Sequence, residues 1–276
     1  KNFYKDFDFQ IKDGYLIYKN GKKIKFTKTL NPLESIKLTG NKYKTKEILK
    51  KYNLATPKGL IYNRETENIN DLIKNINSEL EYPLVIKPTN GQNSVDVYVN
   101  INDEKELIKI IKKLEDKYKK LIIEEMIEGE LYRILIINNN IVDIIFRGNG
   151  YVIGDGINSI KDLIYIENIR RKRDSMLNNK SLILIKKYDV KYIKKQGYDL
   201  DDILPKNIKI YTSKIPTLKT GVEIKRINLN DVHPDNLKLF KKVSKIFNTT
   251  ITGIDFISKD ISKSYKKQGN ILELNS

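Results

Sequence analysis

The chain has 276 residues, and its 52 lysine and arginine residues against 35 aspartate and glutamate residues give a formal net charge of +17. This length is enough for one large α/β domain or for two or three smaller lobes. The chain has no cysteine and one histidine, His233, which excludes a disulfide scaffold or a cysteine-based zinc site and leaves oxygen ligands for any metal. It also lacks a run of about 18 apolar residues and a signal-peptide core. We therefore expect a cytoplasmic protein with no membrane partner.

The positive charge is mostly lysine, and it is spread through the chain instead of being gathered in one tail. Residues 103–120 are an example of a basic segment with a helical pattern. An excess of this kind can serve a nucleic-acid or polyanion groove, but an even spread is typical of solvated helix faces. We therefore expect a small-molecule or peptide substrate and no nucleic-acid partner.

The first half of the chain predicts short strands and helices. Residues 14–27 predict two strands around Asn20-Gly21, a dipeptide suited to the positive φ angles of a type I′ turn. Helices are expected over residues 45–52 and after Asn102, which can act as a helix cap. Further strands are expected over residues 84–87, 95–99 and 121–125.

The second half begins with a predicted hairpin and ends with two predicted strands. Residues 148–158 contain four glycines and predict a loop, after which Ser159 is expected to cap a helix. The stretch 170–216 has little pattern, and we expect part of it to be mobile. His233 precedes Pro234 at a helix start, where a capping role is expected. The strands are predicted over residues 131–137, 141–147, 251–257 and 270–275.

Two acidic residues lie in strands where burial is expected. Asp255 lies within ITGIDFIS, and Glu273 lies within ILELN, where strand alternation places Asn275 on the same face. Two carboxylates and an amide oxygen are hard ligands that suit magnesium shared with substrate phosphates. The alternative is a solvated sheet face on which these acids pair with lysines.

A lysine ends the apolar strand that precedes the polar loop TNGQNS. Lys87 is followed by Pro88 and a turn that contains Gly91, so its amine and the backbone NH groups can approach a phosphate. The alternative is an ordinary exposed strand end in a lysine-rich chain.

Several segments, taken in order along the chain, resemble the ATP-grasp superfamily. Within it, they resemble the ligase domain of cyanophycin synthetases and bifunctional glutathione synthetases. The segments are KYKTKEILKKYNLATPKG (42–59), YPLVIKPTNG (82–91), IIEEMIEGELYR (122–133), YVIGDGINSIKDLI (151–164), DVHPDN (231–236), ITGIDFISKDIS (251–262) and QGNILELN (268–275). The resemblance implies an α+β fold in which two antiparallel sheet-plus-helix lobes sandwich ATP.

The resemblance also implies domain boundaries. It begins near Ser35, which separates an N-terminal hairpin segment, 1–35, from an ATP-grasp domain, 36–276. The small lobe is expected at about 82–125, with the remainder forming the lobe that binds substrate and metal. The sequence does not begin with methionine and ends where similar proteins continue, which is typical of a segment of a longer chain.

The resemblance assigns roles to residues of this chain. The matches to ATP contacts are Lys42 and Lys87 at the phosphates and Glu124, Glu125 and Ile127 at the adenine. The matches to the ligands of two magnesium ions are Asp255, Glu273 and Asn275. On the acceptor side, the matches are Arg147 and Lys214 as catalytic cations and Arg133, Gly154, Asp155 and Gly156 as substrate-binding residues.

The implied activity is ATP- and magnesium-dependent ligation of the carboxylate of an amino acid or peptide to an amine, through an acyl phosphate. Four positions depart from the pattern of the superfamily. Asp96 stands where a glycine is usual, and Leu131 stands in place of an acid, with Glu130 expected to face away. Ser213-Lys214 replaces a basic pair, and residues 217–222 keep one of two glycines.

These departures leave two alternatives to a ligase with a similar substrate. The substrate can be a different one, or the domain can be degenerate and bind nucleotide without ligation. A third hypothesis is a basic polyanion binder, for which binding would depend strongly on salt.

Overall fold

The computed structural model describes residues 9–12, 15–18, 21, 23–25, 30–90, 95–174, 181–213 and 221–276. Near the N-terminus, β1 (Phe9–Lys12), β2 (Tyr15–Tyr18) and β3 (Lys23–Lys25) form an antiparallel three-stranded sheet. The strands β2 and β3 are the hairpin predicted around Asn20-Gly21, and Gly21 has a φ of 82°. The strand β1 has no counterpart in the prediction.

A small lobe is built on a four-stranded antiparallel sheet in the order β4-β7-β5-β6. Its buried core lies between this sheet and two helices, where residues of α3 and α4 pack against the strands. The elements are β4 (Gly59–Asn63), α3 (Ile69–Glu79), β5 (Leu84–Pro88), β6 (Tyr98–Ile101), α4 (Glu104–Glu115) and β7 (Lys120–Glu125). The lobe therefore starts at β4, ahead of the expected start near residue 82, because β4 pairs with β7 along its whole length.

The cap of α4 is Asp103 and not Asn102, the residue that the sequence favoured. The Asp103 carboxylate accepts a hydrogen bond of 2.8 Å from the backbone N–H of Glu106. Asn102 instead donates its side-chain amide to the carbonyl of Asn100. Both residue types are good caps, so the choice depends on where the first helical turn begins.

The large lobe is built on a five-stranded antiparallel sheet in the order β12-β9-β8-β13-β14. Its core contains Phe240, Phe247 and Phe256, and the rings of Phe240 and Phe256 meet edge to face at 5.0 Å. The strands are β8 (Glu130–Ile137), β9 (Asn140–Gly148), β12 (Glu223–Arg226), β13 (Ile251–Ser258) and β14 (Gly269–Asn275). The helices are α1 (Leu33–Thr39), α2 (Lys42–Lys51), η2 (Leu229–Asp231), α7 (Pro234–Ile246) and α8 (Tyr265–Gln268).

The helix α7 begins at Pro234 as predicted. The Nδ1 atom of His233 accepts a hydrogen bond of 3.1 Å from the backbone N–H of Asp235. His233 is thus the helix cap that the sequence indicated, and its imidazole is used within the fold.

A third packed unit lies between β9 and β12 in the chain. It consists of β10 (Tyr151–Ile153), α5 (Ile160–Arg173), α6 (Lys187–Lys195) and β11 (Lys209–Tyr211), around a core of their apolar side chains. Ser159 caps α5 as predicted. The segment 148–158 was expected to be a loop throughout, but β10 lies within it because it pairs with the distant strand β11. Of the weakly patterned stretch 170–216, residues 175–180 and 214–216 lie outside the described residues.

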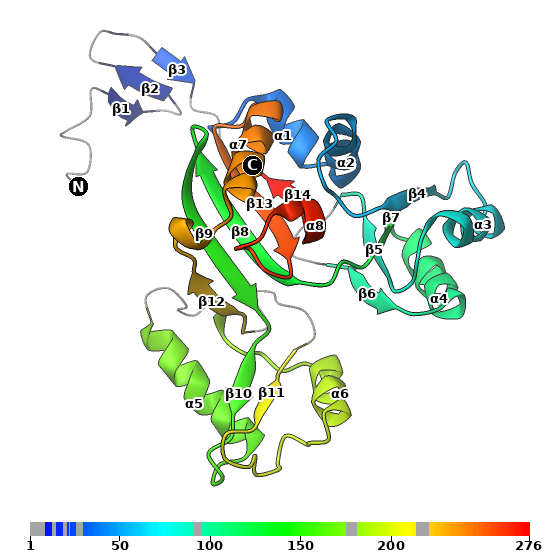
Figure 1. Ribbon diagram of the computed structural model, residues 1–276, viewed down its shortest axis with the longest axis vertical. Coiled ribbons are helices and arrows are strands. Elements are labelled where there is room, and N and C mark those ends of the chain that lie inside the picture. The colour runs from blue at the N-terminus through cyan, green and yellow to red at the C-terminus, as the bar shows by residue number, and fades with distance from the viewer. Residues whose placement is uncertain are drawn as a thin grey trace.

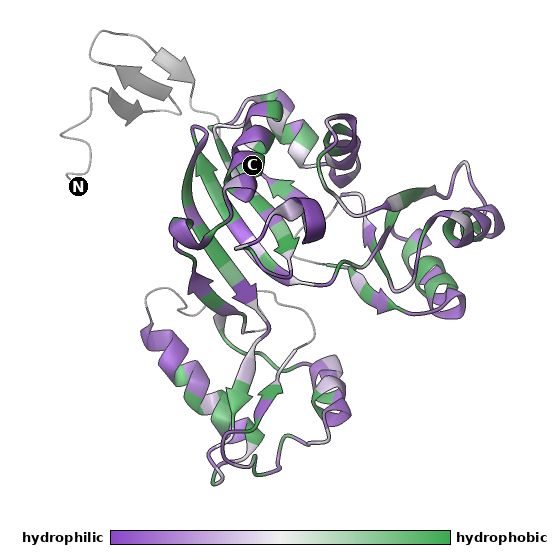
Figure 2. Ribbon diagram, in the orientation of Figure 1, coloured by the Kyte–Doolittle hydropathy of each residue, from purple (hydrophilic) through white to green (hydrophobic). Residues whose placement is uncertain are grey.

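The small lobe lies on one side of the large sheet, and the third unit lies at the end of β9 (Figure 1). Apolar residues follow the strands, whereas the outer faces of the helices are largely hydrophilic (Figure 2). The segment between β7 and β8 links the small lobe to the large one. Among the described helices, none is long and apolar enough to cross a membrane.

Candidate functional site

A cavity of about 910 Å³ lies between the small lobe and the large sheet and reaches the third unit. It receives side chains from both sheets, from the link between β7 and β8, and from β11 and β12. Its chemically informative lining residues are Lys42, Lys87, Glu124, Glu125, Met126, Ile127, Glu130, Arg147, Lys209, Tyr211, Glu223, Asp255, Glu273 and Asn275.

Strand pairing explains why the functional side chains of the large sheet point the same way. Asp255 pairs with Glu273 on one side and with Arg133 on the other, so the three share a face. The opposite face carries Ile254 and Phe256, which are fully buried in the core. The apolar face thus anchors the strands while the polar face is turned to the cavity.

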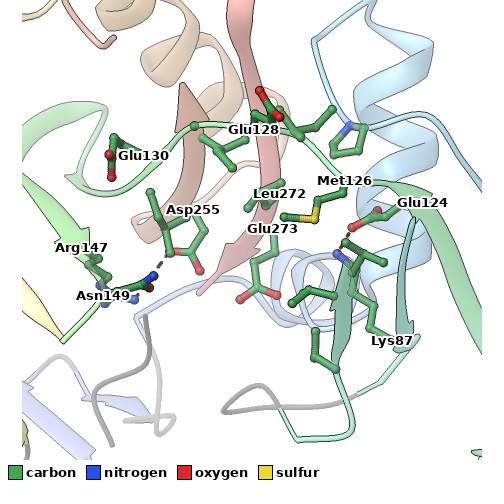
Figure 3. A pocket seen from close by; sticks show the side chains of 18 of the residues that line it. Lys87, Glu124, Met126, Glu128, Glu130, Arg147, Asn149, Asp255, Leu272 and Glu273 are labelled. Carbon is green, nitrogen blue, oxygen red and sulfur yellow. Dashed lines mark hydrogen bonds and ion pairs between the residues drawn. The ribbon is translucent and has the colours of Figure 1, made fainter. Parts of the chain in front are cut away.

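The small-lobe wall of the cavity contains a buried cluster of two lysines and one carboxylate. Glu124 on β7 is 2% exposed, and its Oε1 atom accepts from the Nζ of Lys87 on β5. Its Oε2 atom lies 2.5 Å from the Nζ of Lys46 on α2. Figure 3 shows Lys87 and Glu124 together on this wall. Sequence reasoning missed Lys46, because one more lysine on a helix of a lysine-rich chain carries no distinguishing pattern.

Charge pairing controls the protonation of this cluster. Burial alone would raise the pKa of Glu124, but the charges of Lys87 and Lys46 outweigh it and lower that pKa. Burial lowers the pKa of Lys46 to about 8, although the Glu124 charge acts in the opposite direction. Glu124 is therefore ionised at neutral pH, and Lys46 titrates close to the physiological range.

The two acidic residues predicted at the adenine end behave differently. The carboxylate of Glu125 accepts a hydrogen bond from the backbone N–H of Glu81, away from the Lys46–Lys87 cluster. Its backbone N–H donates to the carbonyl of Lys58. Glu124 therefore supplies the charged group inside the cavity, while Ile127 lines the cavity two positions beyond Glu125.

The three predicted metal ligands come together on β13 and β14. The Nδ2 atom of Asn275 lies 3.4 Å from Oδ2 of Asp255 and 3.4 Å from Oε1 of Glu273. Glu273 also forms an ion pair of 3.1 Å with Lys42, at the start of α2. Figure 3 shows the carboxylates of Asp255 and Glu273 directed into the cavity.

This donor set fits magnesium. Asp255 and Glu273 offer hard carboxylate oxygens from adjacent strands, and half a rotation of the Asn275 amide would present its oxygen beside them. Burial raises the pKa of Asp255, and the nearby charge of Glu273 acts in the same direction. Burial would also raise the pKa of Glu273, but the charge of Lys42, the hydrogen bond with Asp255 and the charge of Lys87 together lower that pKa.

The two arginines predicted on the acceptor side both approach Asp255. Arg133 donates to Oδ1 of Asp255 at 2.8 Å, and its guanidinium lies over Gly253, where a Cβ atom would come within 2.4 Å of it. Arg147 lies 4.0 Å from the same oxygen and lines the cavity. Arg133 therefore supports Asp255. Arg147 lies beside Asp255 in the lining of the cavity (Figure 3).

The predicted substrate-binding loop lies outside the cavity lining. The Asp155 carboxylate accepts hydrogen bonds of 2.8 Å from the backbone N–H groups of Ile157 and Asn158. A Cβ atom on Gly154 would lie 2.1 Å from the carbonyl oxygen of Pro205, and Gly156 has a φ of 81°. Gly154 is thus packed against the backbone of the third unit, while Asp155 and Gly156 form an exposed turn that follows it.

Other cavity residues on the acceptor side were missed by sequence reasoning. The Nζ of Lys209 lies 3.6 Å from the ring centroid of Tyr151 and 5.0 Å from that of Tyr211. Glu223 pairs across strands with Gly148 at the end of β9. The predicted catalytic residue Lys214 lies outside the described residues.

Two of the unusual positions have a structural explanation. Asp96 has a φ of 54°, and its carboxylate accepts from the hydroxyl of Tyr118 at 2.8 Å and lies 3.5 Å from the Nζ of Lys117. Glu130 was expected to face away from the cavity beside Leu131, but both residues belong to its lining (Figure 3). Glu130 reaches it because β8 begins there, directly after the link from the small lobe.

Comparison with known proteins gives consistent matches. Residues 48–155 match the family described as D-ala D-ala ligase C-terminus. The chain is 32% identical over 246 residues to a cyanophycin synthetase of Synechocystis sp., covering 87% of this chain and 28% of that protein. It is 26% identical over 283 residues to the Glutathione biosynthesis bifunctional protein GshAB of Clostridium perfringens, covering 97% of this chain and 35% of that protein.

Among solved structures, the chain is similar to a bifunctional glutathione synthetase from Pasteurella multocida. The TM-score is 0.63 at 18% sequence identity, over 96% of this chain and 36% of that chain. The chain thus spans roughly a third of the length of these relatives.

Two antiparallel lobes facing one another across a cavity, with these matches, define an ATP-grasp domain. Within that superfamily, the chain is similar to cyanophycin synthetases and bifunctional glutathione synthetases, as its motifs predicted.

Proposed function

We propose that this domain catalyses ATP- and magnesium-dependent ligation of the carboxylate of an amino acid or peptide to an amine. The observation that carries this proposal is the convergence of two lysines and two carboxylates on one cavity from opposite lobes. Lys87 reaches it from β5, Lys42 from α2, and Asp255 and Glu273 from β13 and β14. Cations and hard anionic ligands in one cavity are what a nucleoside triphosphate with its metal requires.

In this proposal, ATP lies with its adenine against the link between β7 and β8. Glu124 accepts a hydrogen bond from the exocyclic amine of the adenine, and the Ile127 backbone contacts the ring edge. Lys42 and Lys87 bind the phosphate oxygens, for which each lysine exchanges part of its present ion pair. Binding is thus an exchange of partners within a charged cavity that is already built.

Two magnesium ions, held by Asp255, Glu273 and Asn275, would neutralise charge on the phosphates when bound. Arg133 keeps Asp255 in place through the hydrogen bond between them. Arg147 is assigned to bind the carboxylate that attacks the γ-phosphate, because it lines the cavity and lies 4.0 Å from Asp255.

The reaction then proceeds in two balanced steps. The substrate carboxylate oxygen bonds to the γ-phosphorus, the bond to ADP breaks, and an acyl phosphate forms. The amine next attacks the acyl carbon, loses a proton and displaces inorganic phosphate. The domain contributes by holding the reactants together and by stabilising charge on the transferring phosphoryl group.

The proposal is tested by incubating the protein with ATP, magnesium and pools of amino acids and dipeptides while ADP is measured. We expect ADP formation that depends on both a carboxylate and an amine, with a new amide product seen by mass spectrometry. Absence of such turnover across all pools, with ATP still raising the melting temperature, would leave a nucleotide-binding domain without ligase activity. Absence of both effects would overturn ATP binding itself.

A further inference from the structure

We propose that Lys46 is a positioning residue that serves as the permanent counterion of Glu124, leaving Lys87 free to move from that carboxylate to the phosphates of ATP. The inference rests on the proposed ATP binding and assigns the choice of nucleotide base to the pair formed by Lys46 and Glu124. Lys46 lies within the motif of residues 42–59, but neither the resemblance nor the proposed function assigns it a role.

The small-lobe wall holds one lysine more than its single carboxylate balances. Two lysines share one carboxylate there, and all three side chains are nearly enclosed, with exposed fractions of 6% for Lys46, 7% for Lys87 and 2% for Glu124. A lone buried carboxylate is costly, and a buried pair that loses one partner leaves an uncompensated charge. The wall can therefore release one lysine and still remain balanced, but it cannot release both.

Only one of these two lysines faces the cavity. Lys87 is part of the cavity lining, whereas Lys46 is absent from it. Lys46 is fixed from behind, where its Nζ also donates to the hydroxyl of Thr56 at 3.1 Å. Lys87 can therefore turn toward a ligand in the cavity, whereas Lys46 keeps its contact with Glu124.

The carboxylate of Glu124 has one oxygen beside each lysine. Its Oε2 atom is buried beside the Nζ of Lys46, 2.5 Å away, whereas its Oε1 atom accepts from Lys87 and becomes available when Lys87 turns to the phosphates. An ionised carboxylate of this kind accepts from a purine that carries an amino group at its ring edge and opposes one that carries a carbonyl there. Adenine has the amino group at that edge, and guanine has the carbonyl.

The charged groups around Lys46 define its pH behaviour. Glu124 faces it from β7, Lys87 from β5 and Lys50 from its own helix. Burial lowers the pKa of Lys46 to about 8, so it loses its proton as the pH rises through that value. Above about pH 8, Lys46 is neutral, and Lys87 is the one charged lysine of the pair beside Glu124. Glu124 then holds Lys87 away from the phosphates, so the affinity for ATP falls.

The test compares ATP and GTP binding, in the presence of magnesium, for the wild type, Lys46→Met and the control Lys44→Met. Lys44 is an exposed residue of the same helix, so the control removes the same charge without touching the cluster. We expect Lys46→Met to weaken ATP binding at least about tenfold, to bring the affinities for ATP and GTP closer together, and to remove the fall in affinity above pH 8. Lys44→Met should match the wild type.

A double-mutant cycle with Glu124→Gln keeps the test decisive if Lys46→Met is poorly folded. Without the carboxylate, Lys46 has no charge to balance, so adding Lys46→Met to Glu124→Gln should change ATP affinity by less than about twofold. Equal losses in both backgrounds, or unchanged selectivity and pH dependence in Lys46→Met, would overturn the inference. Failure of the wild type to bind ATP would instead overturn the proposed function.

Discussion

The two ends of the cavity differ in how their polar side chains are held. At the nucleotide end, the carboxylates of Glu124, Asp255 and Glu273 each lie within 3.1 Å of a lysine or arginine nitrogen. At the acceptor end, Lys209 lies against two tyrosine rings. The first end is a closed charge network, and the second is a more open surface.

This difference shows where the function of the domain is built in and where it can vary. A network of buried ion pairs tolerates few changes, because removal of one member leaves another unpaired. An aromatic and cationic surface can accept different ligands with small adjustments. We therefore propose that the nucleotide end carries the general chemistry and that the acceptor end carries the choice of substrate.

The largest expected effect comes from the network itself. Asp255→Asn or Glu273→Gln should lower amine-dependent ADP formation by more than about 100-fold, because each removes a charged ligand for the metal and phosphates. Asp143→Asn is the matched control, since Asp143 pairs with Arg226 on the same sheet at 3.0 Å, outside the cavity lining. Steady-state ADP assays measure the effect, and near-normal rates in the first two variants would contradict the division between the two ends.

The next effect tests whether the glycine-rich turn belongs to the acceptor end at all. Gly154→Ala places a Cβ atom against the backbone of Leu204 and Pro205. We expect a loss of about 1–3 kcal/mol in the free energy of unfolding, as for an overpacked site. Denaturant unfolding measures it. The KM for the acceptor should stay unchanged per folded molecule, and a rise in that KM without destabilisation would place the turn in the substrate site.

A smaller effect is expected at Lys209. Lys209→Met should raise the KM for one substrate about tenfold through loss of a cation, while the affinity for ATP stays constant. The exposed residue Lys206 lies in the same unit, and Lys206→Met serves as the control. Titration of each substrate in turn distinguishes the KM for that substrate from the affinity for ATP. A parallel loss of ATP affinity would show that the two ends are not separate.

The smallest effect concerns the pH dependence of stability. Hydrogen bonds from Asn158, and then from the backbone of Ile157, hold the pKa of Asp155 at about 2, below its ordinary value of 3.8. A folded-state pKa below the unfolded one stabilises the fold above pH 4 and loses that contribution as the pH falls toward 2. Asp155→Asn should therefore lower the melting temperature slightly at pH 7 and not at pH 2, as thermal unfolding at both pH values will show.

The residues of the nucleotide end were largely predictable from the sequence because they lie in strongly patterned strands. Asp255 and Glu273 interrupt apolar runs, and strand alternation alone places Glu273 and Asn275 on one face. The pairing of β13 with β14 then brings all three together, as the prediction of a metal site requires. Whether they bind magnesium remains a prediction.

The acceptor end was less predictable from the sequence because it depends on contacts between distant segments. The strands β10 and β11 have three residues each and pair across an intervening pair of helices, so neither shows a clear period. The packing of Gly154 on Pro205 is likewise a contact between separate segments. Lys46 was missed for a different reason. Its burial depends on its ion pair with Glu124 on β7 and not on its neighbours in the helix.

In the proposed function, ATP lies between the lobes with its base against the link from β7 to β8. Photolabelling with 8-azido-ATP and magnesium, followed by tryptic digestion and peptide mapping, tests this most directly. The account predicts label in the peptide LIIEEMIEGELYR, residues 121–133, and loss of the label when excess ATP is present. Label confined to residues 150–213, or label that excess ATP does not suppress, would contradict it.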